Sequence, residues 1–349
     1  MKKILFASTA LVATAGIASA EVTLSGYAEM GIYNPGKYAD VKNDEVQFFT
    51  DVDLTFTMSG EADNGLVFGA NIDLDEAQKP FTNPWQQGGE ALFVSYGGAT
   101  LTMGDTDSSY DKVVPEMNLG GAGSLADDET IHAGFNAGGD YDGGALNGAD
   151  GQIARFDYAF EGITFSASAM QVQNGSKPEE VVKSTTSTSV ADLTTGVVTT
   201  TSTDNFYADT GETVWSAGVA YKGEFSGLDL NAGVGYITLD EFAEVWGLGV
   251  TAGFAGGFEV GATYSDINFE DSDADGEHWG VGFGYSMNAL SLGVNYGEWS
   301  FEGADRSGYG IAVNYDLGGG LVAQAGYGNS EYEDQEDDDT FSIGLAMSF

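Results

Sequence analysis

A period-two alternation of side chains runs from Leu228 to the last residue and constrains this chain more than any other feature. Apolar or aromatic side chains occupy every second position of eight successive stretches, and none of them is charged. Successive side chains of a β-strand point to opposite sides, so this pattern predicts strands with one apolar face. The alternating positions are Leu228 to Tyr236, Trp246 to Ala252, Phe258 to Tyr264, Trp279 to Tyr285, Leu290 to Tyr296, Tyr309 to Tyr315, Leu321 to Tyr327 and Phe341 to Phe349.

The connections between these stretches alternate in length. Residues 223–227, 253–257, 286–289 and 317–320 are short, whereas residues 266–276, 298–306 and 329–339 are longer and acidic. A soluble β-sandwich also shows alternating strands, so alternation alone does not decide between the two folds. Short turns at one rim and longer loops at the other are typical of an outer-membrane barrel.

Aromatic residues on the apolar face mark one level of the predicted strands. They end the strands that run toward the long loops and begin the strands that return from them. Tyr and Trp prefer the boundary between membrane and water, so a ring of them at one height indicates a membrane interface. The eight residues are Tyr236, Trp246, Tyr264, Trp279, Tyr296, Tyr309, Tyr327 and Phe341.

The first half of the chain is less regular and adds eight strands, which brings the predicted total to sixteen. A barrel of this size encloses a water-filled channel, and an even number of strands places both chain ends at the short-turn rim. We therefore expect an all-β fold, a sixteen-stranded antiparallel transmembrane β-barrel that spans residues 21–349. The added strands are predicted at residues 22–33, 45–59, 66–74, 90–96, 99–104, 152–160, 163–172 and 213–222.

The first twenty residues read as a targeting segment. Lys2 and Lys3 precede an apolar stretch, and Ala18-Ser19-Ala20 provides a small-x-small cleavage pattern. The stretch is short for a membrane-spanning helix, so a cleaved signal peptide over residues 1–20 is preferred to an anchor. The chain would then be exported to the cell outer membrane with Glu21 as its first residue. It contains no cysteine for a disulfide framework.

The charge balance is strongly acidic. Without Lys2 and Lys3, 9 basic residues face 54 acidic ones, which is a net charge of 9 minus 54, or −45. Such a surface repels nucleic acid and attracts cations. A solvated surface of the halophile type and a disordered acidic chain are alternative interpretations. Aromatic residues make up 12% of the chain and alternate regularly, which argues against disorder.

Two predicted loops are much longer than the others. Residues 173–212 are rich in Ser and Thr and are interpreted as an external loop. Within residues 105–151, Val114-Pro115-Glu116 with Gly120-Gly121 resembles the Pro-Glu-x-Gly-Gly motif of the inward-folded constriction loop of Gram-negative general porins, with three residues where the family has one. Residues 22–26, 57–60 and 153–158 also resemble porins of alphaproteobacteria, including the Rhodobacter type. The terminal Phe349 resembles the signature that the barrel assembly machinery recognises.

This resemblance implies a homotrimer in which the third loop narrows each pore and small hydrophilic solutes diffuse passively. Glu116 would line the constriction on the loop side, with Asp111 and Lys112 nearby, and Arg155 would point into the lumen from the polar face of its strand. The family sets several arginines opposite the loop carboxylates, but this chain has only Arg155 and Arg306. The wall residues of the early strands are instead Tyr27, where related porins carry a base, and Glu29, Asp51, Asp53 and Asp73.

Because walls of one sign focus the potential in a narrow channel, these carboxylates predict cation selectivity. The alternative is that the carboxylates are spread through a wide lumen and screened beyond about 8 Å. Asp271, Asp273 and Asp275 match the start of an EF-hand loop, but Gly282 stands where its last ligand belongs. Structural calcium between external loops is therefore a hypothesis beside a solvated acidic rim, and no other cofactor is expected.

Three other function classes fit the sequence less well than a diffusion channel. An enzyme needs an activated group, and the two histidines, His132 and His278, are placed in the constriction loop and on the lumen face. A closed adhesin barrel would differ by the lack of large conductance steps. A substrate-specific channel would show an aromatic ladder along the lumen, whereas the polar face carries mostly Gly, Ser, Asn and acids.

Overall fold

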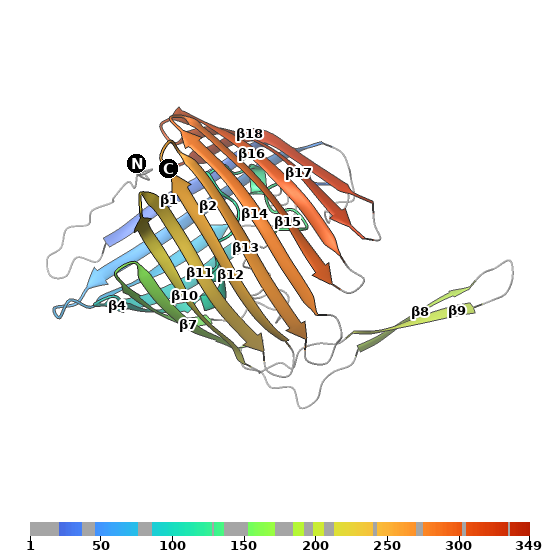
Figure 1. Cartoon of the computed structure of the whole chain (residues 1–349), viewed down its shortest axis with the longest axis horizontal. Coiled ribbons are helices and arrows are strands. Elements are labelled where there is room, and N and C mark those ends of the chain that lie inside the picture. Colours follow the sequence, from blue (N-terminus) through green and yellow to red (C-terminus); the bar gives the residue numbers. More distant parts are fainter. Residues whose placement is uncertain are drawn as a thin grey trace.

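In the computed structural model, sixteen strands form one closed antiparallel barrel, and β8 and β9 form a separate two-stranded sheet (Figure 1). The barrel order is sequential, with β18 paired to β1, and the expected fold is confirmed. The structure describes residues 21–36, 46–75, 86–127, 129–135, 153–171, 184–191, 198–205, 213–239, 243–269, 275–301, 305–333 and 336–349.

The described strands are longer than the predicted ones at several ends; β4, for example, starts at Gln86 rather than at Glu90. The elements are β1 (Glu21–Asn34), β2 (Gln47–Glu61), β3 (Val67–Asp75), β4 (Gln86–Tyr96), β5 (Ala99–Gly104), α1 (Ser109–Val113), η1 (Leu125–Asp127), β6 (Ile153–Phe160), β7 (Ile163–Gln171), β8 (Ser184–Ala191), β9 (Val198–Asn205), β10 (Thr213–Phe225), β11 (Leu228–Leu239), β12 (Ala243–Phe254), β13 (Phe258–Phe269), β14 (Gly276–Met287), β15 (Leu290–Phe301), β16 (Arg306–Gly318), β17 (Leu321–Tyr332) and β18 (Asp338–Ser348).

The apolar face of each strand lies on the outside of the barrel. In β14, Trp279, Val281 and Phe283 are 40%, 43% and 38% exposed, whereas His278 on the opposite face is buried. A soluble protein would bury such large apolar side chains, so an apolar exterior marks a surface made for lipid. Among the described residues, no helix has the length and hydrophobicity to cross a membrane.

The strand register brings the predicted aromatic belt together. Its eight residues form four directly opposed pairs on neighbouring strands: Tyr236 with Trp246, Tyr264 with Trp279, Tyr296 with Tyr309, and Tyr327 with Phe341. Neighbouring pairs also touch, because the ring centroids of Trp279 and Tyr296 lie 5.2 Å apart. The belt therefore follows the loop-side rim of β11 to β18 as a continuous band.

The turns at the opposite rim are tight. Ser226 and Gly227 connect β10 to β11 with φ values of 52° and 81°. Two successive positive φ values are typical of the two-residue hairpin turn whose twist matches the strands. The first barrel strand meets the C-terminal residue at the same rim: the amide of Phe349 donates to the carbonyl of Gly26 at 2.9 Å, and the amide of Gly26 donates to the carbonyl of Phe349 at 3.2 Å.

Part of the predicted external loop forms a hairpin instead of irregular structure. β8 and β9 pair antiparallel from Ser184 with Asn205 to Ala191 with Val198. Thr and Val are β-branched and favour extended backbone, which accounts for a strand pair in a segment that composition alone marks as a loop. Figure 1 shows this hairpin projecting away from the barrel.

Candidate pore constriction

The segment after β5 folds into the barrel and begins with the short helix α1. Ser108 caps this helix, because its Oγ accepts a hydrogen bond from the amide of Asp111 at 3.2 Å. The helix ends before Val114, and Pro115 follows, since a residue before proline is restricted to extended backbone. The sequence thus fixes both ends of the helix locally.

Serines of the barrel wall hold α1 in place. The amide of Ser109 donates to Ser168 Oγ at 3.0 Å, and the amide of Tyr110 donates to Ser216 Oγ at 2.7 Å. The Tyr110 hydroxyl pairs with Ser265 Oγ at 2.8 Å. The first amides of a helix have no partner within the helix, so these wall hydroxyls satisfy groups that burial would otherwise penalise.

From α1 onward, the loop lies along the inner wall on a row of glycines that we call the glycine track. A Cβ atom built on Gly233 would lie 1.7 Å from the carbonyl oxygen of Val113, and one on Gly284 would lie 2.3 Å from the amide nitrogen of Gly120. Only residues without a side chain allow so close an approach. The track consists of Gly233, Gly247, Gly249, Gly261, Gly282, Gly284, Gly293, Gly310, Gly326 and Gly344, which are contributed by β11 to β18.

An apolar cluster, which the sequence pattern does not predict on the lumen side, fills the space between α1 and the wall. Lumen-facing Ile237 and Val245 are fully buried and pack with Tyr110 and Val113 in the same cluster as Trp299. The alternating pattern predicts instead a wet bore lined by polar side chains. The available signal was the switch from Gly and polar residues to Ile, Leu and Val at the loop-side ends of β11 and β12.

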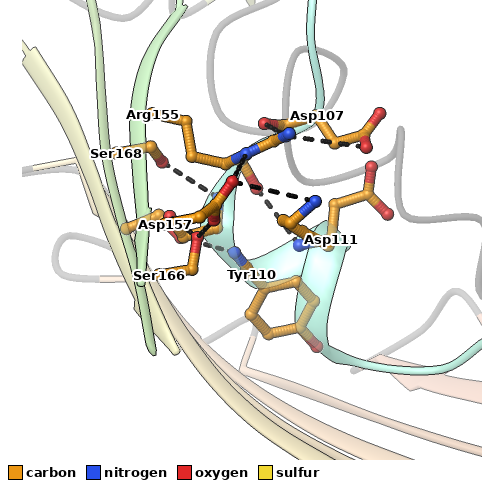
Figure 2. A network of polar contacts seen from close by, with 11 residues as sticks. Asp107, Tyr110, Asp111, Arg155, Asp157, Ser166 and Ser168 are labelled. Atoms are coloured by element: carbon orange, nitrogen blue, oxygen red, sulfur yellow. Dashed lines mark hydrogen bonds and ion pairs between the residues drawn. The ribbon is translucent and has the colours of Figure 1, made fainter. Parts of the chain in front are cut away.

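Arg155 of β6 lies beside the first residues of the inward-folded segment, in a network of ion pairs (Figure 2). Its Nε donates to Asp157 Oδ2 at 3.1 Å, and its Nη1 lies 3.6 Å from Asp107 Oδ2 and donates to the carbonyl oxygen of Asp107. Lys112 Nζ lies 3.8 Å from the same Asp157 oxygen, while Ser166 donates to the other oxygen at 2.7 Å. The Arg155 side chain is only 7% exposed. The guanidinium therefore fastens the loop to β6 and presents little uncompensated positive charge.

The other predicted constriction residues are more accessible to solvent than Arg155. Asp111 is half-buried, and Lys112 and Glu116 are exposed. Glu116 stands between Pro115, which contacts Gly249 of β12, and Met117, which contacts Gly261 of β13. The structure thus joins Lys112 to the Arg155 network and places Glu116 farther along the loop.

The predicted wall residues divide into two groups. Tyr27, Asp53 and Asp73 are partly accessible, and Asp73 accepts a hydrogen bond from Thr55 Oγ1 at 3.0 Å. Glu29 and Asp51 pair across β1 and β2 but are buried, and Glu29 accepts a hydrogen bond from the Tyr27 hydroxyl at 2.7 Å. Strands β1 to β5 contain no Lys or Arg. The wall that the described loop leaves uncovered is therefore acidic.

The two histidines join the loop to the wall. His132 Nδ1 accepts from the amide of Gly134 at 3.1 Å, so its Nε2 carries the hydrogen that faces Asn295 Oδ1 at 3.2 Å. Burial lowers the pKa of His132 to about 4. His278 Nε2 lies 3.0 Å from the carbonyl oxygen of Gly134. Both rings thus anchor the segment that follows α1.

The loop itself carries a buried carboxyl group, on the side that packs against β17. Glu129 is fully buried, and its side chain packs beside Gly326 of β17. Burial raises the pKa of Glu129, because desolvation disfavours the charged form, and the nearby Asp127 acts in the same direction. No sequence pattern distinguishes Glu129 from its neighbours, since acidic residues occur throughout the segment.

Only one of the three predicted calcium ligands falls in the described part of the chain. Asp275 Oδ1 accepts a hydrogen bond from the amide of Phe269 at 3.1 Å, which closes the turn before β14. Asp271 and Asp273 lie outside the described residues. Within the ranges that the structure covers, no group of three His, Cys, Asp or Glu side chains could hold a metal ion. Calcium therefore stays a prediction.

Comparisons with known proteins agree with this geometry. A triple mutant of the Rh. blastica porin is 16% identical, with a TM-score of 0.63, and covers 94% of this chain and 100% of its own. A porin structure refined at 1.8 Å resolution is 19% identical, with the same coverage and a TM-score of 0.63. No curated protein sequence matches the chain. The family model described as Gram-negative porin matches residues 7–335. Because this match spans nearly the whole sequence, the chain belongs to the Gram-negative porin family.

Proposed function

We propose that this outer-membrane porin forms a water-filled channel for passive diffusion of small hydrophilic solutes and that the channel favours cations. Family and fold indicate a channel rather than an enzyme. The described loop packs against the inside of β7, of β10 to β18 and of the loop-side part of β1, so the passage lies between its outer face and the wall of β2 to β5. Asp53 and Asp73 face this passage from the wall, and Asp111 and Glu116 face it from the loop.

The observation that carries the proposal is the absence of Lys and Arg from β1 to β5, opposite the loop. A cluster of arginines there would produce a transverse field, with positive charge on one side and negative charge on the other. Arg155 does not replace it, because Asp157 and Asp107 compensate its charge. Carboxylates on both sides of a narrow passage focus a negative potential and raise the local concentration of cations.

Reversal potentials in planar bilayers under a KCl gradient test this proposal. We expect a reversal potential with the sign that corresponds to K⁺ permeation. The reversal potential of Asp73→Asn should be smaller than that of the wild type. Salt should weaken the preference, because screening shortens the range of each charge to about 3 Å at 1 M. A reversal potential with the sign of Cl⁻ permeation would disprove cation selectivity.

The assembly and export of the channel are further parts of the proposal. The homotrimer is supported by a hollow of about 500 Å³ on the outer face of β2 to β5, where Met58, Phe68 and Leu92 could receive side chains of a neighbouring subunit. Chemical cross-linking in detergent should then yield species up to a trimer. Export with removal of residues 1–20 predicts Glu21 as the first residue of the protein isolated from the outer membrane, and deletion of Phe349 should reduce its assembly there.

A further inference from the structure

A cavity of about 440 Å³ lies inside the barrel where the chain leaves β5 for the loop. Its lining comes from the lumen faces of β3 to β6 and from the first residues of the loop. This is the wall that the described part of the loop leaves uncovered, so a solute that crosses the barrel passes this cavity. The side chains that give it chemical character are Asn71, Asp73, Phe93, Asp105, Asp107 and Arg155.

The cavity carries a net negative charge. Asp73, Asp105 and Asp107 contribute three carboxylates, and Arg155 contributes the one guanidinium of the lining. The Arg155 charge is already compensated, because its Nε contacts Asp157 and its Nη1 contacts Asp107. A ligand that enters this space therefore meets carboxylates on two sides, on β3 and at the start of the loop, which favours a positively charged group.

The remaining lining indicates that this positive group belongs to an organic molecule. The Phe93 ring covers Gly69 of β3 on the lumen side, since a Cβ atom on Gly69 would be 2.7 Å from two of its ring atoms. An aromatic face next to carboxylates attracts an ammonium group and also covers a short apolar body. A hard metal ion needs six or more oxygens at about 2.3–2.6 Å, and no three acidic side chains of the described chain converge so closely.

From these observations we infer that the cavity is a binding subsite for small organic ammonium ions. Its volume of about 440 Å³ is within the range typical of ligand pockets, roughly 300–1,000 Å³. The ammonium group binds between Asp73 and Asp105, the apolar body packs on Phe93, and Asn71 and the hydroxyl of Thr102 remain as polar contacts. The inference rests on the proposed channel function and adds a solute class to it.

Current block in planar bilayers tests the inference on the full-length porin. With KCl on both sides, n-butylammonium chloride should reduce the K⁺ current in a saturable manner. Sodium butyrate and n-butanol share the apolar body without the positive charge and should leave the current nearly unchanged. Asp73→Asn and Asp105→Asn should each raise the half-blocking concentration roughly tenfold, as expected when one hydrogen bond to a charged group is lost. Phe93→Leu should raise it by a smaller factor.

Asp229→Asn provides the matched control. Asp229 faces the lumen on β11 near the short-turn rim, outside the cavity, so this variant removes the same charge and should leave the block unchanged. A linear decrease of the current without saturation, or equal block by butyrate or butanol, would overturn the inference. If the block is absent while the reversal potential still shows K⁺ preference, the inference fails and the proposed function stands. Loss of the K⁺ preference itself refutes the proposed function.

Discussion

Replacement of one glycine of the track by alanine should displace the constriction loop. In Gly233→Ala, the new Cβ would lie 1.7 Å from the carbonyl oxygen of Val113, whereas ordinary contact begins at 3.4 Å. The end of α1 must therefore move about 1.7 Å away from β11. This shift breaks the hydrogen bonds of Ser109 and Tyr110 to the wall, and three such bonds at about 1 kcal/mol each amount to about 3 kcal/mol. The displaced loop should narrow the passage.

The assays are single-channel conductance and thermal unfolding in detergent. We expect a lower conductance and a lower melting temperature for Gly233→Ala than for the wild type. Gly253→Ala is the control, because Gly253 also faces the lumen but its new Cβ would meet only Asp229, whose Cβ would be the nearest atom at 3.3 Å, and no part of the loop. Wild-type conductance and melting in Gly233→Ala would refute the view that the glycine track seats the loop.

Three further predictions concern buried or acidic groups. Burial raises the pKa of Glu129, so the folded protein loses stability as the pH rises above the carboxyl pKa of the unfolded chain, about 4.3. Glu129→Gln should therefore have a higher free energy of unfolding than the wild type at neutral pH, by up to about 1.4 kcal/mol for each pH unit of the shift, and a higher melting temperature. An equal melting temperature would contradict this reasoning. Burial lowers the pKa of His132 to about 4, so loop docking is most stable above about pH 6.5 and weakens as the pH falls through 4. The single-channel conductance should therefore change more between pH 7 and pH 4 in the wild type than in His132→Asn. Identical conductance profiles would refute a role of His132 in loop docking. If calcium bridges the external loops through Asp271, Asp273 and Asp275, a chelator should lower the melting temperature of the wild type but not of Asp275→Asn, whereas unchanged melting of the wild type would count against calcium.

The barrel could be predicted from the sequence because its signals are local. A strand exposes alternate side chains to lipid and to the lumen, so the apolar positions from Leu228 onward identify each strand and its outer face. The partners at the short turns, such as Phe254 with Phe258 and Met287 with Leu290, then follow from the turn lengths, since a short turn fixes the register of the strands that it connects. Neither inference needs a contact between distant parts of the chain.

The constriction could be predicted only in outline. The sequence placed Asp111, Lys112 and Glu116 on an inward-folded loop, but it could not show that Arg155 is compensated by Asp107 and Asp157. Composition likewise marked residues 173–212 as a loop, whereas pairing between β8 and β9 makes part of it a hairpin.

The sequence by itself determined the barrel, its apolar exterior and its aromatic belt, because a strand repeats the same choice of environment at every second residue. Only the tertiary structure decided which lumen side chains stay in contact with water. Tyr110 reaches Ser265 across 155 residues of chain, and the loop that it anchors covers the apolar positions of β11 and β12. Such contacts depend on where the closed barrel places distant strands, and no local pattern of residues encodes that position.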